Sequence, residues 1–361
     1  MVLPNIAAHK FNLKKAQHQQ QITSALFIVN RSSGAGHTRQ AAKLLENRFY
    51  NQFQPGIPHC LYAVTAGHDQ VRQITHEFLE TFPGPWLLLS GGGSGTNRAQ
   101  IQAIMDNIER GSVQPDDIYI TALRLGSGNI IARHLNLPAD PMLALARIAD
   151  SLPKGNTLPC CLYRCVCHDS HGQSQTYYGA TLAGIGQFSQ VPQDVAHWRQ
   201  RHPQLMTQLL NHIPIETINN WQYTTFSLLR ALKCLLRPQR ADDVMIEQDG
   251  RLTSLRLFAG MLINFDFPPL PFQTGCLINQ PRLKLCLIPQ TSRRQMLAAL
   301  AHWHSLDNYI LTYTLTPERP IAIHFVSDSQ TTLALDEDIF VVPTHIRFEV
   351  APSIHFVTGG G

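Results

Sequence analysis

Short apolar segments alternate with amphipathic segments between residue 22 and about residue 150. The apolar segments have the length of buried strands and lie at 26–29, 60–64, 86–89 and 118–123. Between them, apolar residues recur at helical spacing, as Ala42, Leu45 and Phe49 do. The helical segments lie at 37–53, around 71–78, around 101–108 and at 130–135. This alternation predicts a parallel sheet that is covered by helices.

The pattern changes after residue 150. Pro138, Pro141 and Pro153 interrupt the helical pattern, and residues 154–156 have the composition of a turn. Strand-like segments then lie at 160–167, 175–183, 244–246, 252–257, 261–265, 283–288, 310–315, 321–326, 339–342 and 346–350, with helical segments near 194–210, 223–236 and 293–302. We expect a disordered arm at 1–21, an α/β domain at 22–150 and a mostly antiparallel β domain at 151–358.

Three glycine-rich turns follow three of the predicted parallel strands. They contain Asn30, Ser32, Ser33 and Gly34; Gly92, Gly93, Ser94, Gly95 and Thr96; and Gly126, Ser127, Gly128 and Asn129. Because the carboxyl ends of parallel strands meet at one edge of a sheet, we expect the turns to lie together. Glycine lets backbone N–H groups approach anionic oxygens, so the sequence predicts a phosphate-binding site. The alternative is that these residues only form turns, and that Thr96 and Asn129 cap the helices behind them.

The composition narrows the class of protein. A length of 361 residues with 44% hydrophobic and 15% charged residues suits a soluble protein of two domains. No segment approaches the ~18 apolar residues of a membrane-spanning helix, and the first residues lack the apolar core of a signal peptide. We therefore expect a cytoplasmic protein. The net charge of +4 does not point to nucleic acid.

Cysteines and histidines crowd together at residues 160–171. They suggest a zinc site, but the C-x-x-C spacing of common structural zinc sites is missing. Cys161, Cys165 and Cys167 share one face of a strand at period two. We therefore interpret them as small core residues.

The three turns together resemble those of the diacylglycerol kinase and sphingosine kinase family. The similarity extends beyond the turns, because 177–186, Asp249-Gly250 and 257–264 resemble later strands and turns of that family. It also covers 335–338, where the family has an Asp-Gly-Glu turn. The resemblance spans nearly the whole chain after residue 22. It implies an NAD kinase/diacylglycerol kinase-like α/β domain, an antiparallel β-sandwich domain and a cleft between them.

The resemblance also implies an activity. Members of the family transfer the γ-phosphoryl group of ATP, with Mg2+, to a lipid hydroxyl. The three turns would then hold ATP. Asp336 and Asp338 would serve as catalytic acids and metal ligands, although a charged surface turn is the alternative. A lipid substrate implies peripheral contact with a membrane, and a homodimer is left open.

The chain departs from the family in the second turn. The family has Gly-Gly-Asp-Gly-Thr, and Ser94 stands at the aspartate position. A serine hydroxyl donates hydrogen bonds to phosphate but is no base near neutral pH. Ala99 stands where a glutamate often follows the turn. The sequence therefore leaves three hypotheses: an attenuated lipid kinase in which Ser94 keeps a catalytic role, a non-catalytic protein that binds nucleotide or lipid, and an NAD kinase.

A basic amphipathic helix is the candidate membrane element. Its apolar residues are Phe226, Leu229, Leu232 and Leu236, and its basic residues are Arg230, Lys233, Arg237 and Arg240. Such helices bind anionic interfaces. The favoured interpretation is nevertheless a helix that packs on the β domain and leaves its basic face in solvent.

Overall fold

The structure, a computed structural model, describes most of the chain from residue 21 onward. The described residues are 21–33, 37–126, 128–168, 172–210, 212–213, 215–236, 242–266, 274–290, 292, 294–295, 298, 309–326, 332–336, 338–340 and 344–360. The arm expected at 1–21 lies outside this set up to residue 20, and so does most of the helix expected at 293–302.

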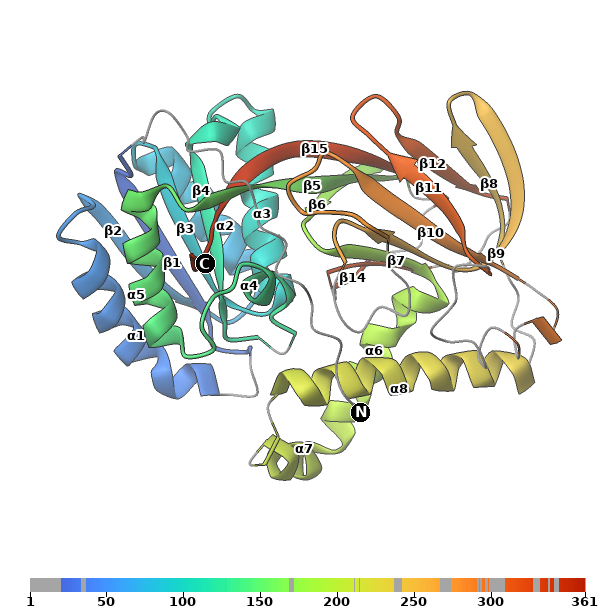
Figure 1. Ribbon diagram of the computed structural model, residues 1–361, viewed down its shortest axis with the longest axis horizontal. Helices are drawn as coiled ribbons and strands as arrows, with labels where there is room; N and C mark the ends of the chain where they lie inside the picture. Colours follow the sequence, from blue (N-terminus) through green and yellow to red (C-terminus); the bar gives the residue numbers. More distant parts are fainter. Residues whose placement is uncertain are drawn as a thin grey trace.

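The first half of the chain forms a parallel sheet between two layers of helices. The strands are β1 (Ser24–Asn30), β2 (His59–Thr65), β3 (Trp86–Gly92) and β4 (Ile118–Arg124), in the order β2-β1-β3-β4. The helices are α1 (His37–Phe53), α2 (His68–Thr81), α3 (Ser94–Glu109), α4 (Ile130–His134) and α5 (Pro141–Ser151). Helices α1 and α5 cover one face, and α2 and α3 cover the other (Figure 1). We call the elements from β1 to α5 the N-terminal lobe.

Burial explains why these segments became strands and helices. All residues of β1 and β3 are buried, as expected of central strands that are covered on both faces. Phe27 of β1 packs against Phe49 of α1, with ring centroids 5.6 Å apart. The apolar face of α1 that the helical spacing predicted is therefore the face that covers the sheet.

The second half of the chain is built from antiparallel pairs, apart from one junction. Its strands are β5 (Thr157–His168), β6 (Ser174–Gly179), β7 (Leu182–Gly186), β8 (Asp242–Gln248), β9 (Arg251–Ile263), β10 (Leu283–Pro289), β11 (Leu311–Leu315), β12 (Ile321–Phe325), β13 (Leu333–Leu335), β14 (Asp338–Phe340) and β15 (His345–Val357). Single 3-10 turns lie at Pro115–Asp117, Leu152–Lys154 and Gln187–Gln190. We call the elements from β5 to β15 the C-terminal lobe. The predicted fold class, a helix-covered parallel sheet followed by an antiparallel β domain, is confirmed.

Strand β15 joins the two lobes. It pairs antiparallel with β5 and β12, and its end pairs parallel with β4 through His355 and Tyr119. In the described part of the chain, all strands therefore belong to one 15-stranded sheet. The division at residue 150 stays a prediction, and β15 returns across it.

Three cysteines of β5 lie in the core of the C-terminal lobe. Cys161 and Cys165 are buried with Tyr163, and Cys167 packs partly buried against them. The interpretation of these cysteines as core residues is confirmed. Among the described residues, no group of three histidines, cysteines or carboxylates is placed to hold a metal ion.

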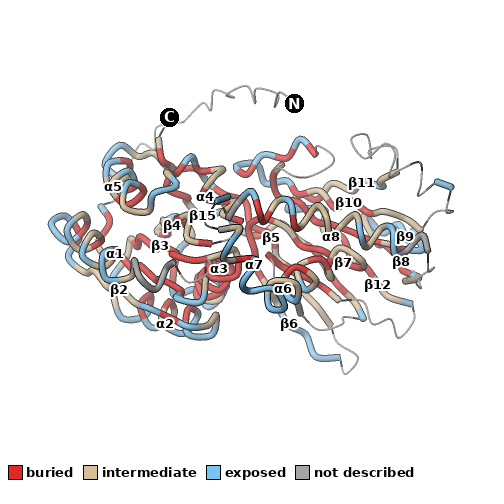
Figure 2. Tube along the Cα trace, turned by 90° about the horizontal axis from the view of Figure 1, so that it is seen from below, coloured by how far each residue is buried: buried red, intermediate tan, exposed pale blue. Residues whose placement is uncertain are grey.

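Three helices lie on the lower side of the C-terminal lobe. They are α6 (Val191–Arg201), α7 (Pro203–Leu210) and α8 (Ile215–Leu236), and Figure 2 shows α8 along that side. The segment expected as one helix at 194–210 is divided, because the residue before Pro203 is kept out of the helical conformation. Arg230 of α8 binds Asp194 of α6, with Nη2 donating to Oδ1 at 2.8 Å and Nε donating to Oδ2. Its Nη1 donates to Oε1 of Gln190.

Three histidines stack across neighbouring strands at one end of the β sheet. The ring of His345 on β15 lies 4.4 Å from that of His324 on β12 and 5.1 Å from that of His168 on β5. Burial, followed by the charges of His324 and His168, lowers the pKa of His345 to about 4. Arg347 acts in the same direction, and Glu247 opposes it.

This stack makes the stability of the fold sensitive to acid. The folded pKa of His345 is depressed below its ordinary 6.5, so the free energy of unfolding is highest while the ring is neutral. It should fall as the pH drops from about 6.5 toward about 4, by on the order of 1–2 kcal/mol after solvent screening. Urea unfolding of the His345→Gln variant at pH 7 and pH 5 should show a smaller loss than the wild type. The exposed His197→Gln should not, and an equal loss in both variants would refute this origin.

Candidate functional site

The first glycine-rich turn is closed by the side chain at the end of β1. The Oδ1 atom of Asn30 accepts a hydrogen bond from the N–H of Ser32 at 3.0 Å, and its Nδ2 donates to Oγ1 of Thr96 at 3.1 Å. Asn30 is buried, while Ser32 is exposed. Asn30 therefore ties the first turn to the second. Gly34 lies outside the described residues.

The second turn runs directly into helix α3. Gly93 precedes the helix with no side-chain cap, and Ser94 is its first residue. Thr96 lies inside the first turn of the helix, so its expected role as the helix cap is wrong. A Cβ atom at Gly92 would overlap the side chain of Thr96, which is why glycine is required there. The half-buried Ser94 and Gly93 thus stand at the positive end of a long helix.

The third turn packs its backbone directly on the second. A Cβ atom at Gly126 would overlap the backbone of Gly93, so only glycine permits this approach. Asn129, in the left-handed conformation with φ of 50°, accepts a hydrogen bond from the N–H of Gly126 at 2.9 Å. Its side chain closes the turn rather than capping α4. Gly128 is buried, and Ser127 lies outside the described residues.

The three turns come together at one edge of the parallel sheet. Besides the Asn30–Thr96 bond and the Gly93–Gly126 approach, Oγ of Ser33 accepts a hydrogen bond from the N–H of Gly93 at 3.3 Å. We call the described residues of these turns, 30–33, 92–96, 126 and 128–129, the rim. The expectation that they lie side by side is confirmed. Whether the rim binds a nucleotide stays a prediction.

Asp336 lies in the turn between β13 and β14, and its carboxylate points into the protein. It is 3% exposed, with φ of 45°. Its Oδ1 accepts hydrogen bonds from the N–H groups of Thr181 at 3.2 Å and Leu182 at 3.0 Å, and from the Thr181 hydroxyl. Its Oδ2 accepts from the N–H of Ala180 at 3.2 Å. The carboxylate therefore orders the turn between β6 and β7, which is why the expected single strand at 175–183 is divided there.

Two effects act on the protonation of this carboxyl group. Burial raises the pKa of Asp336, and the hydrogen bonds from Thr181 and the backbone N–H groups oppose that rise. The positive charge of Arg98 also opposes it. Arg98 on α3 is a buried charged residue, 6% exposed, that the sequence analysis did not predict as part of the site. The residues from Gly95 to Met105 are all buried, which the polar composition around Arg98 does not indicate.

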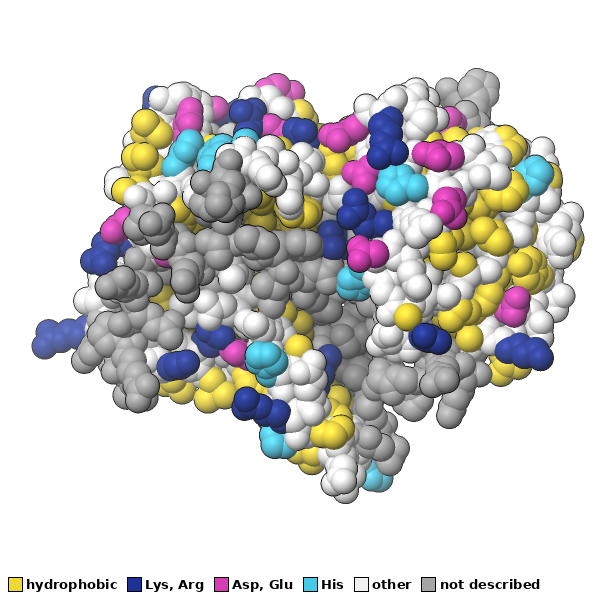
Figure 3. Space-filling model, turned by 180° about the vertical axis from the view of Figure 1, so that it is seen from behind, with side chains coloured by type: hydrophobic (Ala, Val, Ile, Leu, Met, Phe, Trp, Pro, Cys, Tyr) yellow, Lys and Arg dark blue, Asp and Glu magenta, His cyan; other side chains and the backbone are white. Residues whose placement is uncertain are grey.

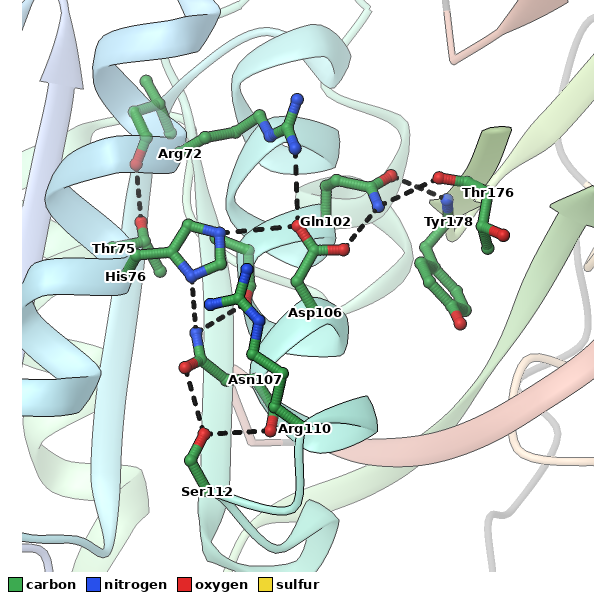
Figure 4. Close-up of polar contacts among 12 residues, drawn as sticks. Arg72, Thr75, His76, Gln102, Asp106, Asn107, Arg110, Ser112, Thr176 and Tyr178 are labelled. Carbon is green, nitrogen blue, oxygen red and sulfur yellow. Dashed lines mark hydrogen bonds and ion pairs between the residues drawn. The ribbon is translucent and has the colours of Figure 1, made fainter. Parts of the chain in front are cut away.

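Helix α3 is fixed from both sides by polar contacts (Figure 4). On the side of α2, Arg72 pairs with Asp106 at 3.4 Å. On the side of the C-terminal lobe, Nε2 of Gln102 donates to the carbonyl of Thr176 at 3.3 Å, and its Oε1 accepts from the N–H of Tyr178 at 3.0 Å. The helix that begins at the rim is thus bonded directly to β6.

Charges of both signs are mixed on the outer surface near α2 and α3. Figure 3 shows Lys and Arg side chains interspersed with Asp and Glu over this face of the molecule. Glu109 pairs with Arg164 at 3.4 Å, and Arg164 pairs with Glu349 at 2.7 Å. Among the described residues of this surface, Glu109, Arg164 and Glu349 thus form ion pairs with one another.

The comparisons with known proteins bear on the N-terminal lobe. Residues 24–157 match the family model of the diacylglycerol kinase catalytic domain. The family resemblance is confirmed. A comparison with curated proteins gave no match.

Two solved structures share the fold of this chain over most of its length. A diacylglycerol kinase from Bacillus anthracis is 14% identical, with a TM-score of 0.58, over 94% of this chain and 97% of that one. Yeast NADH kinase in complex with NADH is 11% identical, with a TM-score of 0.54, over 94% of this chain and 84% of that one. At these identities the likeness shows the fold alone. The match to the diacylglycerol kinase catalytic domain favours a resemblance to the diacylglycerol kinases over one to the NADH kinase.

The divalent metal implied by the diacylglycerol kinase family does not fit the described carboxylates. Both oxygens of Asp336 are occupied by donors of the protein, and Ser94 carries no charge. Asp338 begins β14, and its side chain lies outside the description. The pairing of Asp336 with Asp338 as metal ligands therefore stays a prediction.

A substitution at Asp336 separates structure from catalysis. Asp336→Asn keeps the left-handed backbone but places an amide NH2 against N–H donors. We expect the free energy of unfolding to fall by about 2–4 kcal/mol, because buried donors lose their acceptor. Urea unfolding measures this. The matched Asp249→Asn, also left-handed with φ of 53° but on the surface, should change it little. An Asp336→Asn protein as stable as wild type would contradict this structural role.

Proposed function

We propose that the chain is an ATP-dependent, lipid kinase-like protein with attenuated transfer. The rim would hold the polyphosphate of ATP, and the γ-phosphoryl group would pass to a hydroxyl of a lipid. The observation that carries the proposal is the meeting of the three turns at the carboxyl ends of β1, β3 and β4. The match to the diacylglycerol kinase catalytic domain supports it. The lipid is of the diacylglycerol or sphingoid type by resemblance.

Different residues of the rim would make different contacts with the phosphate groups. Gly92, Gly93 and Gly126 let backbone N–H groups approach the ligand. At Gly92 and Gly126 a Cβ atom would also overlap neighbouring atoms. The uncapped start of α3 adds the positive end of a helix. ATP supplies the phosphoryl group. The hydroxyl of Ser94 is placed to donate a hydrogen bond, and the chain offers no carboxylate there.

The missing carboxylate explains why we propose attenuation. A general base typically contributes about 10²–10⁴ in rate. Phosphoryl transfer depends mostly on positioning and on stabilisation of charge, which the rim retains in part. Slow transfer is therefore compatible with Ser94.

A non-catalytic protein that binds nucleotide or lipid is the second candidate. The hydrogen bonding of Asp336 favours this second candidate. Its carboxylate accepts four hydrogen bonds from the protein, and it could act as a base only if some of them were broken. Nucleotide binding without turnover would support this candidate. Formation of NADP from NAD would instead favour the NAD kinase alternative.

Restoring the family carboxylate tests the catalytic proposal. We expect Ser94→Asp to raise transfer of labelled phosphate from ATP into a lipid extract by about tenfold or more, because a base is returned to the site. Ser94→Asn, of similar size and uncharged, should give no rise.

Gly93→Asp is the inactive control. A Cβ atom there meets only open space beyond the Gly126 backbone at 3.9 Å, so its carboxylate would repel phosphate without a clash. Wild-type transfer no higher than this control would refute the enzyme proposal. A fall in turnover for Ser94→Asp, in an active preparation, would assign Ser94 to another mechanism.

Helix α8 carries an exposed apolar face that supports the proposed contact with lipid. Trp221, Leu229 and Leu232 are 60%, 51% and 48% exposed, and their spacing puts them on one side of the helix. Lys233 is exposed beside them. Arg230 instead holds α6, and residues 237–240 lie outside the description. The sequence analysis favoured a helix that packs on the β domain and leaves only its basic face in solvent. That interpretation is corrected, because part of the apolar face is also in solvent. No described helix is long and apolar enough to cross a membrane.

Vesicle binding tests this face. A Trp221→Ser, Leu229→Ser double variant should lose about tenfold or more of its affinity for vesicles of phosphatidylcholine and phosphatidylglycerol, because two apolar side chains no longer enter the interface. Cosedimentation measures the bound fraction. Leu252→Ser, at a leucine 65% exposed on β9, is the matched control. Equal binding of all three proteins would refute a role for this face. A cytoplasmic location and a homodimer stay predictions.

A further inference from the structure

The carboxylate expected to hold magnesium is committed to the protein itself. Mg2+ binds oxygen ligands in a near-ideal octahedron and keeps several waters. Asp336 is 3% exposed, and its two oxygens accept bonds from residues 180, 181 and 182. A Cβ atom at Gly179 would lie only 2.6 Å from its Oδ2. Gly179 therefore packs closely against Oδ2, and the carboxylate is enclosed by atoms of the protein.

The charged residue nearest in sequence to the second turn is basic. Ser94 is neutral, and Ala99 is buried and apolar. Arg98 follows Ser94 by four residues, so the two lie on the same side of α3. The charge of Arg98 acts on Asp336, Tyr163 and Tyr177, so Arg98 lies near the turn at Asp336 as well as one helical turn from Ser94.

We propose that this chain binds the polyphosphate of its nucleotide through backbone N–H groups and the charge of Arg98, with no divalent cation held by its carboxylates. The proposal rests on the proposed function, because it concerns the same rim. Positive charge within the protein does part of the neutralisation that a protein-bound cation would otherwise supply. A carboxylate at position 94 would reverse this balance.

The test is calorimetric binding of ADP to the full chain, in EDTA and in excess Mg2+. ADP is not turned over, so the readout is independent of activity. We expect the two dissociation constants to agree within about threefold. Weakening by about tenfold or more in EDTA would overturn the proposal and leave the proposed function standing. Binding no stronger than that of Gly93→Asp in either buffer would overturn both.

Variants at position 94 test the cause. Ser94→Asp should weaken ADP binding in EDTA by about tenfold or more, with recovery in Mg2+, because its carboxylate repels phosphate until a cation is present. Ser94→Asn should behave as wild type in both buffers. The same metal dependence in both variants would overturn the argument from charge.

Variants at two further positions complete the test. Arg98→Gln should weaken binding in EDTA, while Arg98→Lys, which keeps the charge, should retain it. Asp338→Asn should leave the ratio of the two dissociation constants unchanged. A ratio that changes only in Asp338→Asn would place a metal on that carboxylate and overturn the proposal.

Discussion

Helix α3 is held on both sides, by α2 and by β6, and the geometry of the rim depends on that hold. The helix begins at the second turn, so any shift of the helix moves Gly93 against Gly126, where the backbones are already in contact. Gln102 uses both ends of its amide to bond the backbone of β6. The C-terminal lobe therefore sets the position of a turn that belongs to the N-terminal lobe.

The buried turn at Asp336 depends on the same helix. A buried carboxylate is costly unless donors surround it, and here three backbone N–H groups and a hydroxyl do so. Arg98 adds its charge from α3. Helix α3 thus begins at the rim and carries Arg98, while the connection between β6 and β7 binds the carboxylate of Asp336.

The sequence predicted what local patterning decides. The four parallel strands, their helices and the placement of the three turns follow from apolar spacing and glycine positions near in sequence. What it could not predict rests on contacts between distant residues. Asp336 meets its donors 154–156 residues earlier in the chain, so no local pattern shows that its carboxylate points inward. The pairing of β15 with β4 and the exposure of Trp221 likewise depend on which surfaces the folded chain covers.

Under the proposed function, nucleotide binding and catalysis would depend on different features of this chain. Binding at the rim depends on backbone geometry, which the glycines and the packing of α3 fix regardless of the side chain at position 94. Catalysis depends on a few side-chain carboxylates, and each is lost by a single substitution or taken by a new partner. Here Ser94 replaces one, and the donors of the β6–β7 turn occupy another. In the proposed function, such a scaffold would therefore retain phosphate binding after phosphoryl transfer is lost, because binding would rest on the backbone of the rim and transfer on a few side chains.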